Sequence, residues 1–228
     1  RRNLKEFSFI YVCMKGISID IGVHNFAIYI EEFDVSKLKT LSCPKTQRYN
    51  DNGEATDRFK NQVLNHVYTN GKKILLDKVD LSTKKGSLFD VQTFINLTNY
   101  LDSKVKDFDN CAFVVIEQQL KTNPMAQRLE QHCVSWFTIT YLDTKEIIIF
   151  PARNKTQVLG APRKLPNKKT EVFKSSRDPE KLALRLFPTM TPPQRKKWAC
   201  DEASKIFTLR NDMETMKHIF VTNKRKAY

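Results

Sequence analysis

Hydrophobic residues gather in short runs along this chain, and polar stretches separate one run from the next. The first two runs, residues 9–20 and 26–33, are rich in β-branched and aromatic residues and flank a turn containing Gly, His and Asn. This pattern predicts a β-hairpin. Three later apolar runs, residues 74–81, 112–116 and 146–150, predict further strands. The sequence therefore predicts five strands.

Other segments carry apolar residues at helical spacing. Between Asp90 and Val105 the apolar positions recur every three or four residues, which predicts a helix. Pro124 opens another predicted helix, which runs to Leu142, because proline is pre-organised for the first helical turn. Its apolar stripe is more typical of intrachain core than of an interface. Later helices are predicted at residues 169–175, 178–187 and 192–210.

The order of these elements predicts the fold class. Strands and helices alternate after an initial hairpin, which indicates an α/β fold with a mixed sheet flanked by helices. No Gly/Ser-rich linker divides the 228 residues, so we expect a single domain over residues 1–228. Residues 43–72 are polar and rich in turn signals, with a short helix near residues 56–67, and are interpreted as an insertion. Residues 160–169 contain two prolines and four basic residues and predict a basic loop.

The chain is strongly basic. Thirty-nine Lys and Arg residues stand against 25 acidic ones, and the net charge is +14. Residues 151–198 hold most of this excess, with 13 basic and 3 acidic residues. A polyanionic partner is favoured, because each neutralised phosphate releases condensed counterions. A membrane partner is not expected, since no apolar run approaches the roughly 20 residues that span a bilayer.

Cysteines and histidines argue against zinc and against a disulfide framework. The five cysteines are odd in number and scattered, and no two have Cys-x-x-Cys spacing. Cys13, Cys111 and Cys133 lie in apolar segments and are predicted to be small core residues in a reducing, intracellular compartment. The four histidines include no His-Glu-x-x-His pair.

Two acids stand at the ends of apolar runs. Asp20 ends the first predicted strand, and Glu117 directly follows the predicted strand at residues 112–116. If these strands are neighbours, the carboxylates converge, as metal-dependent phosphodiester hydrolysis requires. Asp201, on the last predicted helix, is the best candidate for a third acid. Mg²⁺ suits such a site, since carboxylates bind it while it keeps exchangeable waters. The alternative for any single acid is an ordinary solvated surface group.

Two motifs carry a resemblance to a known family. Residues 20–25 read Asp-Ile-Gly-Val-His-Asn, and residues 114–119 read Val-Val-Ile-Glu-Gln-Gln. Together with the late basic helix they resemble the RuvC-like Holliday junction resolvases, in the poxvirus and large-DNA-virus branch, with the fungal mitochondrial resolvases as a sister group. The resemblance covers residues 16–210. It implies a ribonuclease H-like five-stranded mixed sheet and a homodimer that nicks four-way DNA junctions symmetrically with Mg²⁺, for which Mn²⁺ substitutes.

The resemblance also implies roles for individual residues. Asp20, Glu117 and Asp201 match the family's metal ligands, and Lys155 matches a lysine that stabilises charge on the scissile phosphate. An ordinary contact between Lys155 and the DNA backbone is an equally good interpretation. Ser204 stands where the family carries a second acid on the last helix, so Ser204 is a possible site neighbour. The residues expected to contact DNA are Lys121, Asn123, Arg153, Arg163, Lys164, Lys168, Lys169, Lys196 and Lys197.

Two alternatives to a junction resolvase stay open from the sequence. One is a resolvase-derived nucleic-acid-binding protein with weakened catalysis, which the serine at position 204 favours. The other is a ribonuclease H-like nuclease that acts on flaps or hybrids, since a fold does not determine its substrate. The resemblance favours a viral protein acting in the host cytoplasm, with the mitochondrial matrix as the alternative compartment.

Overall fold

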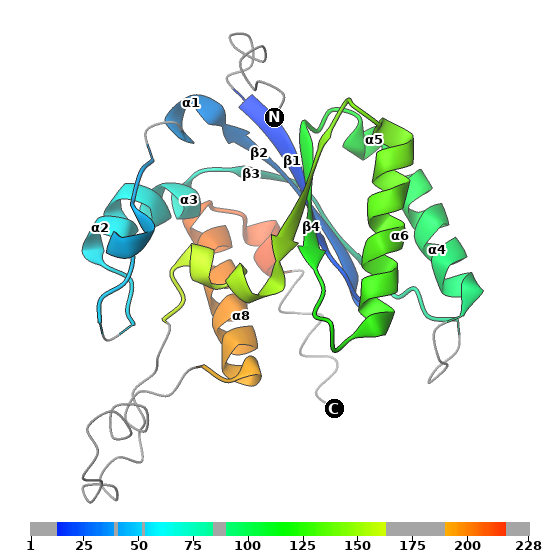
Figure 1. Ribbon diagram of the computed structural model, residues 1–228. Helices are drawn as coiled ribbons and strands as arrows, with labels where there is room; N and C mark the ends of the chain where they lie inside the picture. Colours follow the sequence, from blue (N-terminus) through cyan, green and yellow to red (C-terminus); the bar gives the residue numbers. More distant parts are fainter. Residues whose placement is uncertain (1–12, 39–40, 52, 84–89, 163–189, 218–228) are drawn as a thin grey trace, which may run out of the picture. The chain divides into compact units, whose positions relative to one another are not determined.

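The computed structural model describes residues 13–38, 41–51, 53–83, 90–162 and 190–217 (Figure 1). The chain divides into two compact units. The first unit contains residues 1–40 and 71–152, and the second unit contains residues 41–70 and 153–228.

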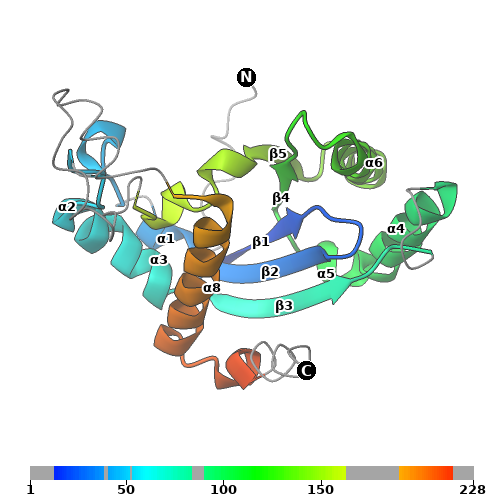
Figure 2. The same cartoon turned by 90° about the horizontal axis from the view of Figure 1, so that it is seen from below.

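The first unit is built on a five-stranded sheet with the order β3-β2-β1-β4-β5 (Figure 2). Strands β1 and β2 pair antiparallel, as do β2 and β3, whereas β4 runs parallel to both β1 and β5. The five-stranded mixed sheet predicted from the sequence is confirmed. The strands are β1 (Cys13–Asp20), β2 (Phe26–Asp34), β3 (Lys72–Val79), β4 (Phe113–Gln118) and β5 (Glu146–Pro151).

Two long helices pack together against one face of this sheet, α4 (Val91–Ser103) and α6 (Pro124–Tyr141) (Figure 1). Asp90 caps α4, since its carboxylate accepts the backbone N–H of Thr93 at 3.1 Å. Pro124 occupies the first turn of α6, as the sequence predicted. The first unit also contains the short helices α1 (Val35–Leu38) and α5 (Val105–Phe108).

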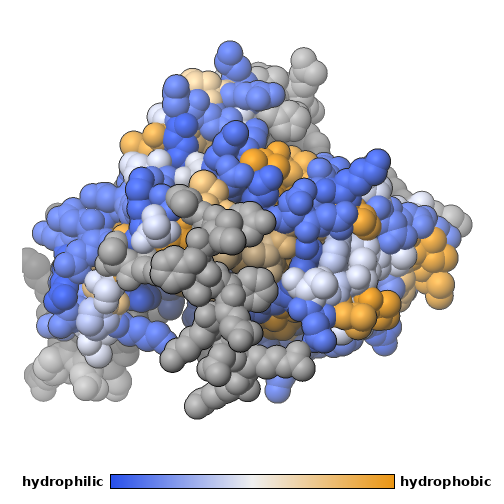
Figure 3. Space-filling view, turned by 90° about the horizontal axis from the view of Figure 1, so that it is seen from above, coloured by the Kyte–Doolittle hydropathy of each residue, from blue (hydrophilic) through white to orange (hydrophobic). Residues whose placement is uncertain are grey.

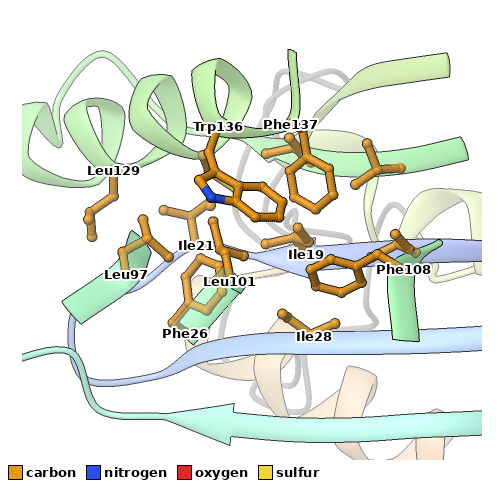
Figure 4. Packing of buried hydrophobic residues seen from close by; sticks show 14 of the residues in the cluster. Ile19, Ile21, Phe26, Ile28, Leu97, Leu101, Phe108, Leu129, Trp136 and Phe137 are labelled. Atoms are coloured by element: carbon orange, nitrogen blue, oxygen red, sulfur yellow. The ribbon is translucent and has the colours of Figure 1, made fainter. Parts of the chain in front are cut away.

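The core lies between the sheet and these two helices. Alternate residues of the central strands, Ile17 and Ile19 of β1 and Ile116 of β4, are at most 2% exposed. Figure 4 shows Trp136 and Phe137 of α6 directed toward the sheet residues Ile19 and Ile28. The apolar stripe of α6 is therefore intrachain core. Further core members are Phe26, Leu97, Leu101, Phe108, Leu129 and Cys133.

The cysteine predictions are confirmed in part. Cys111 and Cys133 are buried with unpaired thiols, as expected. The prediction for Cys13 was wrong: it is exposed, because it begins β1 at the end of the strand away from the core residues Ile17 and Ile19. No helix in the described ranges is both long enough and apolar enough to cross a bilayer. On the face drawn in Figure 3, hydrophilic residues predominate and hydrophobic ones form small separate patches.

The second unit has its own small core. Phe59, Leu64 and Tyr68 of the 41–70 segment are buried together, and Leu159 and Ile206 from later in the chain pack against them. The predicted helix near residues 56–67 is confirmed as a helical stretch with a π turn. The helical elements of the second unit are η2 (Lys45–Gln47), α2 (Asp57–Phe59), η3 (Lys60–Leu64), α3 (Asn65–Thr69), η5 (Gln157–Leu159) and α8 (Pro192–Leu209). A further short helix, η4 (Ala152–Asn154), comes directly after β5.

Helix α8 confirms the predicted helix at residues 192–210 to within one residue. The predicted helices at residues 169–175 and 178–187 lie outside the described residues, as does most of the predicted basic loop at 160–169.

Candidate active site

The two acids singled out by the sequence lie on neighbouring strands. The parallel pairing of β1 with β4 sets Ile19 opposite Ile116, and Asp20 and Glu117 are the next residue along each strand. Because Ile19 and Ile116 face the core, strand alternation turns both acids to the opposite face of the sheet. Asp20 is exposed and Glu117 is half-buried. The structure therefore brings these two predicted site residues together at the carboxyl ends of their strands.

A tight turn follows Asp20 and returns the chain into β2. A Cβ atom added at Gly22 would lie 3.1 Å from the carbonyl oxygen of Asn25, closer than almost all real Cβ contacts. Glycine therefore allows the close backbone approach at this hairpin. The backbone N–H of Leu81 donates to the carbonyl oxygen of Val23 at 2.8 Å, which ties the turn to the end of β3. Asp20 thus stands at a fixed strand end.

Polar side chains from the neighbouring strands extend the row that contains the acids. Asp20 pairs with Ala27 of β2, and Ala27 pairs with Lys78 of β3. Directly paired residues share a face, so Lys78 lies on the same face as Asp20, two strands away. Its ammonium donates to Oδ1 of Asn25 at 3.4 Å. The sequence interpretation assigned no role to Lys78, because strand order is needed to place it in this row.

A histidine–carboxylate pair lies at the rim of the same hairpin. Nδ1 of His24 is 3.3 Å from Oδ1 of Asp80. The hydroxyl of Ser82 donates to the same carboxylate oxygen at 2.7 Å and its backbone N–H at 2.9 Å. These hydrogen bonds from Ser82, before the contact with His24, lower the pKa of Asp80. The lowered pKa keeps Asp80 an anion beside the imidazole of His24.

The carboxylate of Glu117 is held by a residue two positions further along. Nε2 of Gln119 donates to Oε2 of Glu117 at 3.2 Å. The backbone N–H of Gln119 in turn donates to the carboxylate of Glu130 on α6 at 2.6 Å. Gln119 belongs to the Val-Val-Ile-Glu-Gln-Gln motif, but the motif alone predicts no role for it. Gln119 lies one residue beyond the end of β4, and its spacing of two from Glu117 is the signal that could have indicated a shared face.

The third predicted acid, Asp201, belongs to the second unit. It is exposed on α8, and Ser204 is half-buried one turn further on. The hydroxyl of Ser204 donates to the carbonyl oxygen of Cys200 in its own helix at 2.8 Å. This hydrogen bond uses the only hydrogen of the Ser204 hydroxyl. Toward any other group, the hydroxyl oxygen can therefore act only as a neutral acceptor. The pairing of Asp201 with Asp20 and Glu117 stays a prediction.

Glu202, next to Asp201, is engaged within the second unit. Its carboxylate lies 3.7 Å from the ammonium of Lys205 and is close enough to Tyr68 of α3 to influence the pKa of its hydroxyl. Burial raises the pKa of the Tyr68 hydroxyl, and Glu202 raises it further. Glu202 therefore points toward the core of the second unit, which leaves Asp201 as the acid of this pair on another side of the helix.

The predicted DNA-contacting residues have different surroundings. Lys121 is exposed in the turn after β4. Asn123 caps α6 by accepting the N–H of Ala126 at 3.2 Å, so its side chain has a structural role. Lys155 is exposed just after η4, and Lys196 and Lys197 are exposed on the first turns of α8. Outside the described positions are the side chain of Arg153 and all of Arg163, Lys164, Lys168 and Lys169.

The donor chemistry at the acid pair fits Mg²⁺. Carboxylate oxygens are the ligands that Mg²⁺ takes, and one or two of them suffice because the ion keeps several waters. Asp20 and Glu117 supply such oxygens from adjacent strands. Across the part of the chain that the structure describes, no three His, Cys, Asp or Glu side chains gather closely enough to hold a metal ion. Asp20 and Glu117 are the candidate carboxylate ligands that the first unit contributes.

Comparison with known proteins gives two viral relatives. The chain is 25% identical over 204 residues to "Uncharacterized protein 170L" of Invertebrate iridescent virus 6, an alignment that covers 83% of this chain and 79% of that protein. It is 24% identical over 210 residues to "Uncharacterized protein 97L" of Invertebrate iridescent virus 3, covering 85% and 86%. No family model matches the chain. The chain is thus similar along most of its length to proteins of invertebrate iridescent viruses.

Proposed function

We propose that this protein is a Mg²⁺-dependent, structure-selective endonuclease with a ribonuclease H-like fold that resolves four-way DNA junctions. The observation that carries the proposal is that Asp20 and Glu117 directly follow the paired residues Ile19 and Ile116 at the carboxyl ends of two parallel neighbouring strands. The five-stranded mixed sheet with these acids on its central strands is the arrangement that the resemblance implies. Similarity to iridescent virus proteins supports the viral branch of that family, and action in the host cytoplasm is part of the proposal.

Each residue has a distinct role in this proposal. Asp20 and Glu117 hold the divalent cations, and Asp201 is the third carboxylate that the proposal requires. Bound Mg²⁺, or Mn²⁺ in its place, supplies an activated water and neutralises charge on the leaving oxygen. Lys155 stabilises charge on the scissile phosphate. Lys121, Lys196 and Lys197 position the DNA backbone without reading bases.

A homodimer is part of the proposal, because paired symmetric nicks in a four-way junction require two active sites. The net charge of +14 supports a nucleic-acid partner. The exposed lysines at the start of α8 are in keeping with a basic surface that follows the phosphate backbone.

A second candidate is a junction-binding protein with weakened catalysis. The observation that favours it is the hydrogen bond from Ser204 to the carbonyl oxygen of Cys200, since a neutral hydroxyl replaces a charged ligand poorly. Such a protein binds junctions tightly through its basic residues but cleaves them slowly. The same experiment separates the two candidates.

The test is cleavage of a labelled four-way junction with Mg²⁺, beside a linear duplex and an RNA–DNA hybrid. Symmetric nicks are expected in the four-way junction, and no cleavage is expected in the linear duplex or the hybrid. Asp20→Asn or Glu117→Gln should abolish cleavage and keep junction affinity, because the cation is lost while basic contacts remain. Glu146→Gln removes the same charge from an exposed residue at the other end of the sheet and should cleave normally. Cleavage by Asp20→Asn at the wild-type rate would refute the proposed site, and binding without nicks would favour the second candidate.

A further inference from the structure

Glu117 ends its strand at a connection that the fold holds at several points. After β4 the chain makes a turn in which the N–H of Asn123 donates to the carbonyl oxygen of Leu120 at 2.9 Å, and α6 begins at once. Glu130, in the second turn of α6, reaches back to the strand end and accepts the N–H of Gln119 at 2.6 Å. A carboxylate acceptor and so short a distance mark this as a strong, charge-assisted hydrogen bond.

The anchor of this contact is rigid. Leu129, the residue before Glu130, is fully buried, and so is Cys133 one turn later. The backbone of Glu130 is therefore fixed by the core on which α6 packs. A side chain attached to such a helix holds a strand end more firmly than a side chain on a loop does. Glu130 thus fixes the backbone of Gln119 relative to α6.

Gln119 in turn orients the carboxylate of Glu117. Its backbone is fixed by Glu130, and its amide Nε2 lies 3.2 Å from Oε2 and 3.4 Å from the carbonyl oxygen of Glu117. An amide has donors of fixed direction, so one oxygen of the Glu117 carboxylate is held in a defined orientation. Both Gln119 and Glu130 are half-buried, which limits competition from water for these hydrogen bonds.

We propose that Gln119 and Glu130 are positioning residues which orient the Glu117 carboxylate for a divalent cation and so set the metal affinity of the site. The inference rests on the proposed function, because it assigns a purpose to the contacts that surround one of its metal ligands. Partners that orient a ligating group contribute about 10- to 100-fold to metal affinity or activity. Losing the Gln119 amide should therefore weaken metal binding by about that factor.

The test measures Mn²⁺ binding by titration calorimetry and the Mg²⁺ dependence of junction cleavage. Gln119→Met keeps the length of the side chain but removes its donor, and should weaken Mn²⁺ binding by about 10-fold or more. Saturating Mg²⁺ should restore its cleavage rate, unlike that of Glu117→Gln, because the ligand itself is still present. Gln118→Met, the same change at the exposed neighbouring residue, should bind Mn²⁺ like the wild type.

Glu130 provides an independent variant. Glu130→Gln keeps an oxygen that accepts the N–H of Gln119 and should retain most of the Mn²⁺ affinity, whereas Glu130→Leu should lose it to the extent that Gln119→Met does. Melting temperatures in the absence of metal show whether each variant is folded. A folded Gln119→Met protein with wild-type Mn²⁺ affinity would overturn the inference and leave the proposed function standing. Absence of Mn²⁺ binding by the wild type would overturn both.

Discussion

Replacing Asp20 with Asn should stabilise the metal-free protein while it abolishes cleavage. Asp20 and Glu117 directly follow the paired residues Ile19 and Ile116 on parallel strands, and neighbouring strands are about 4.8 Å apart. Two like charges about 6 Å apart repel by about 0.7 kcal/mol in water and about 3 kcal/mol at an effective dielectric constant of 20. Because Asp20 is exposed, the lower end of this range applies, and about 1 kcal/mol is expected.

Thermal unfolding measures this gain. For a chain of this size, about 1 kcal/mol corresponds to a rise in Tm of about 2–4 °C. The rise should appear with EDTA and shrink in 1 M salt, which screens exposed charges. Added Mg²⁺ should raise the Tm of the wild type, because a ligand that binds only the folded state stabilises it, and should leave Asp20→Asn unchanged.

Glu146→Gln is the matched control, since it removes one exposed carboxylate from the same sheet away from the acid pair. Its Tm should change little, with or without Mg²⁺, because surface substitutions away from special features stay within about 0.5 kcal/mol. A lower Tm for metal-free Asp20→Asn, or an equal response of this variant and the wild type to Mg²⁺, would refute the reasoning.

Three further predictions concern stability and binding. Burial lowers the pKa of His132 below 6.5, so the unfolded state binds more protons at this residue than the folded state does. The free energy of unfolding should therefore fall as the pH drops through 6.5. Urea titrations at pH 5 and pH 8 should show a smaller loss for His132→Gln than for the wild type. Phe137→Ala should cost about 3–5 kcal/mol of unfolding free energy, measured in urea, since Phe137 is fully buried; a cost below 1 kcal/mol would contradict its core position. Lys196→Ala with Lys197→Ala should weaken DNA binding uniformly and reduce the salt slope of log K by about 1–2, and an unchanged slope would show that they contact no phosphate.

The sequence predicted the strands and α6 well, because local patterns determine them. Strand β2, predicted over residues 26–33, covers Phe26–Asp34, and its buried residues alternate as a half-buried strand requires. Helix α6 begins at Pro124, where a local rule places it. These elements carry their signal within a window of a few residues.

Contacts between distant segments could not be predicted in the same way. Residues 43–72 had been interpreted as an insertion, but nothing local indicates that Tyr68 donates to the carbonyl oxygen of Leu159, 91 residues away, at 2.9 Å. The role of Gln119 depends on Glu130, which lies on the next element and reaches back to the strand end. Lys78 joins the row of Asp20 only once β3 is known to lie beside β2. All three features depend on contacts between separate elements, which no short stretch of the sequence reveals.

The shared face of the two acids follows from the burial of the core. In β1 the burial of Ile17 and Ile19 forces Asp20 to the opposite face, and in β4 the burial of Ile116 does the same for Glu117. A slip of either strand by one residue would turn its acid into the core and its isoleucines out of it. Burying an unpaired carboxylate costs several kcal/mol, and exposing each isoleucine costs about 2 kcal/mol more. Burial of the isoleucines therefore places both carboxylates on the same face, and the register that pairs Ile19 with Ile116 places them at the same level of the two strands.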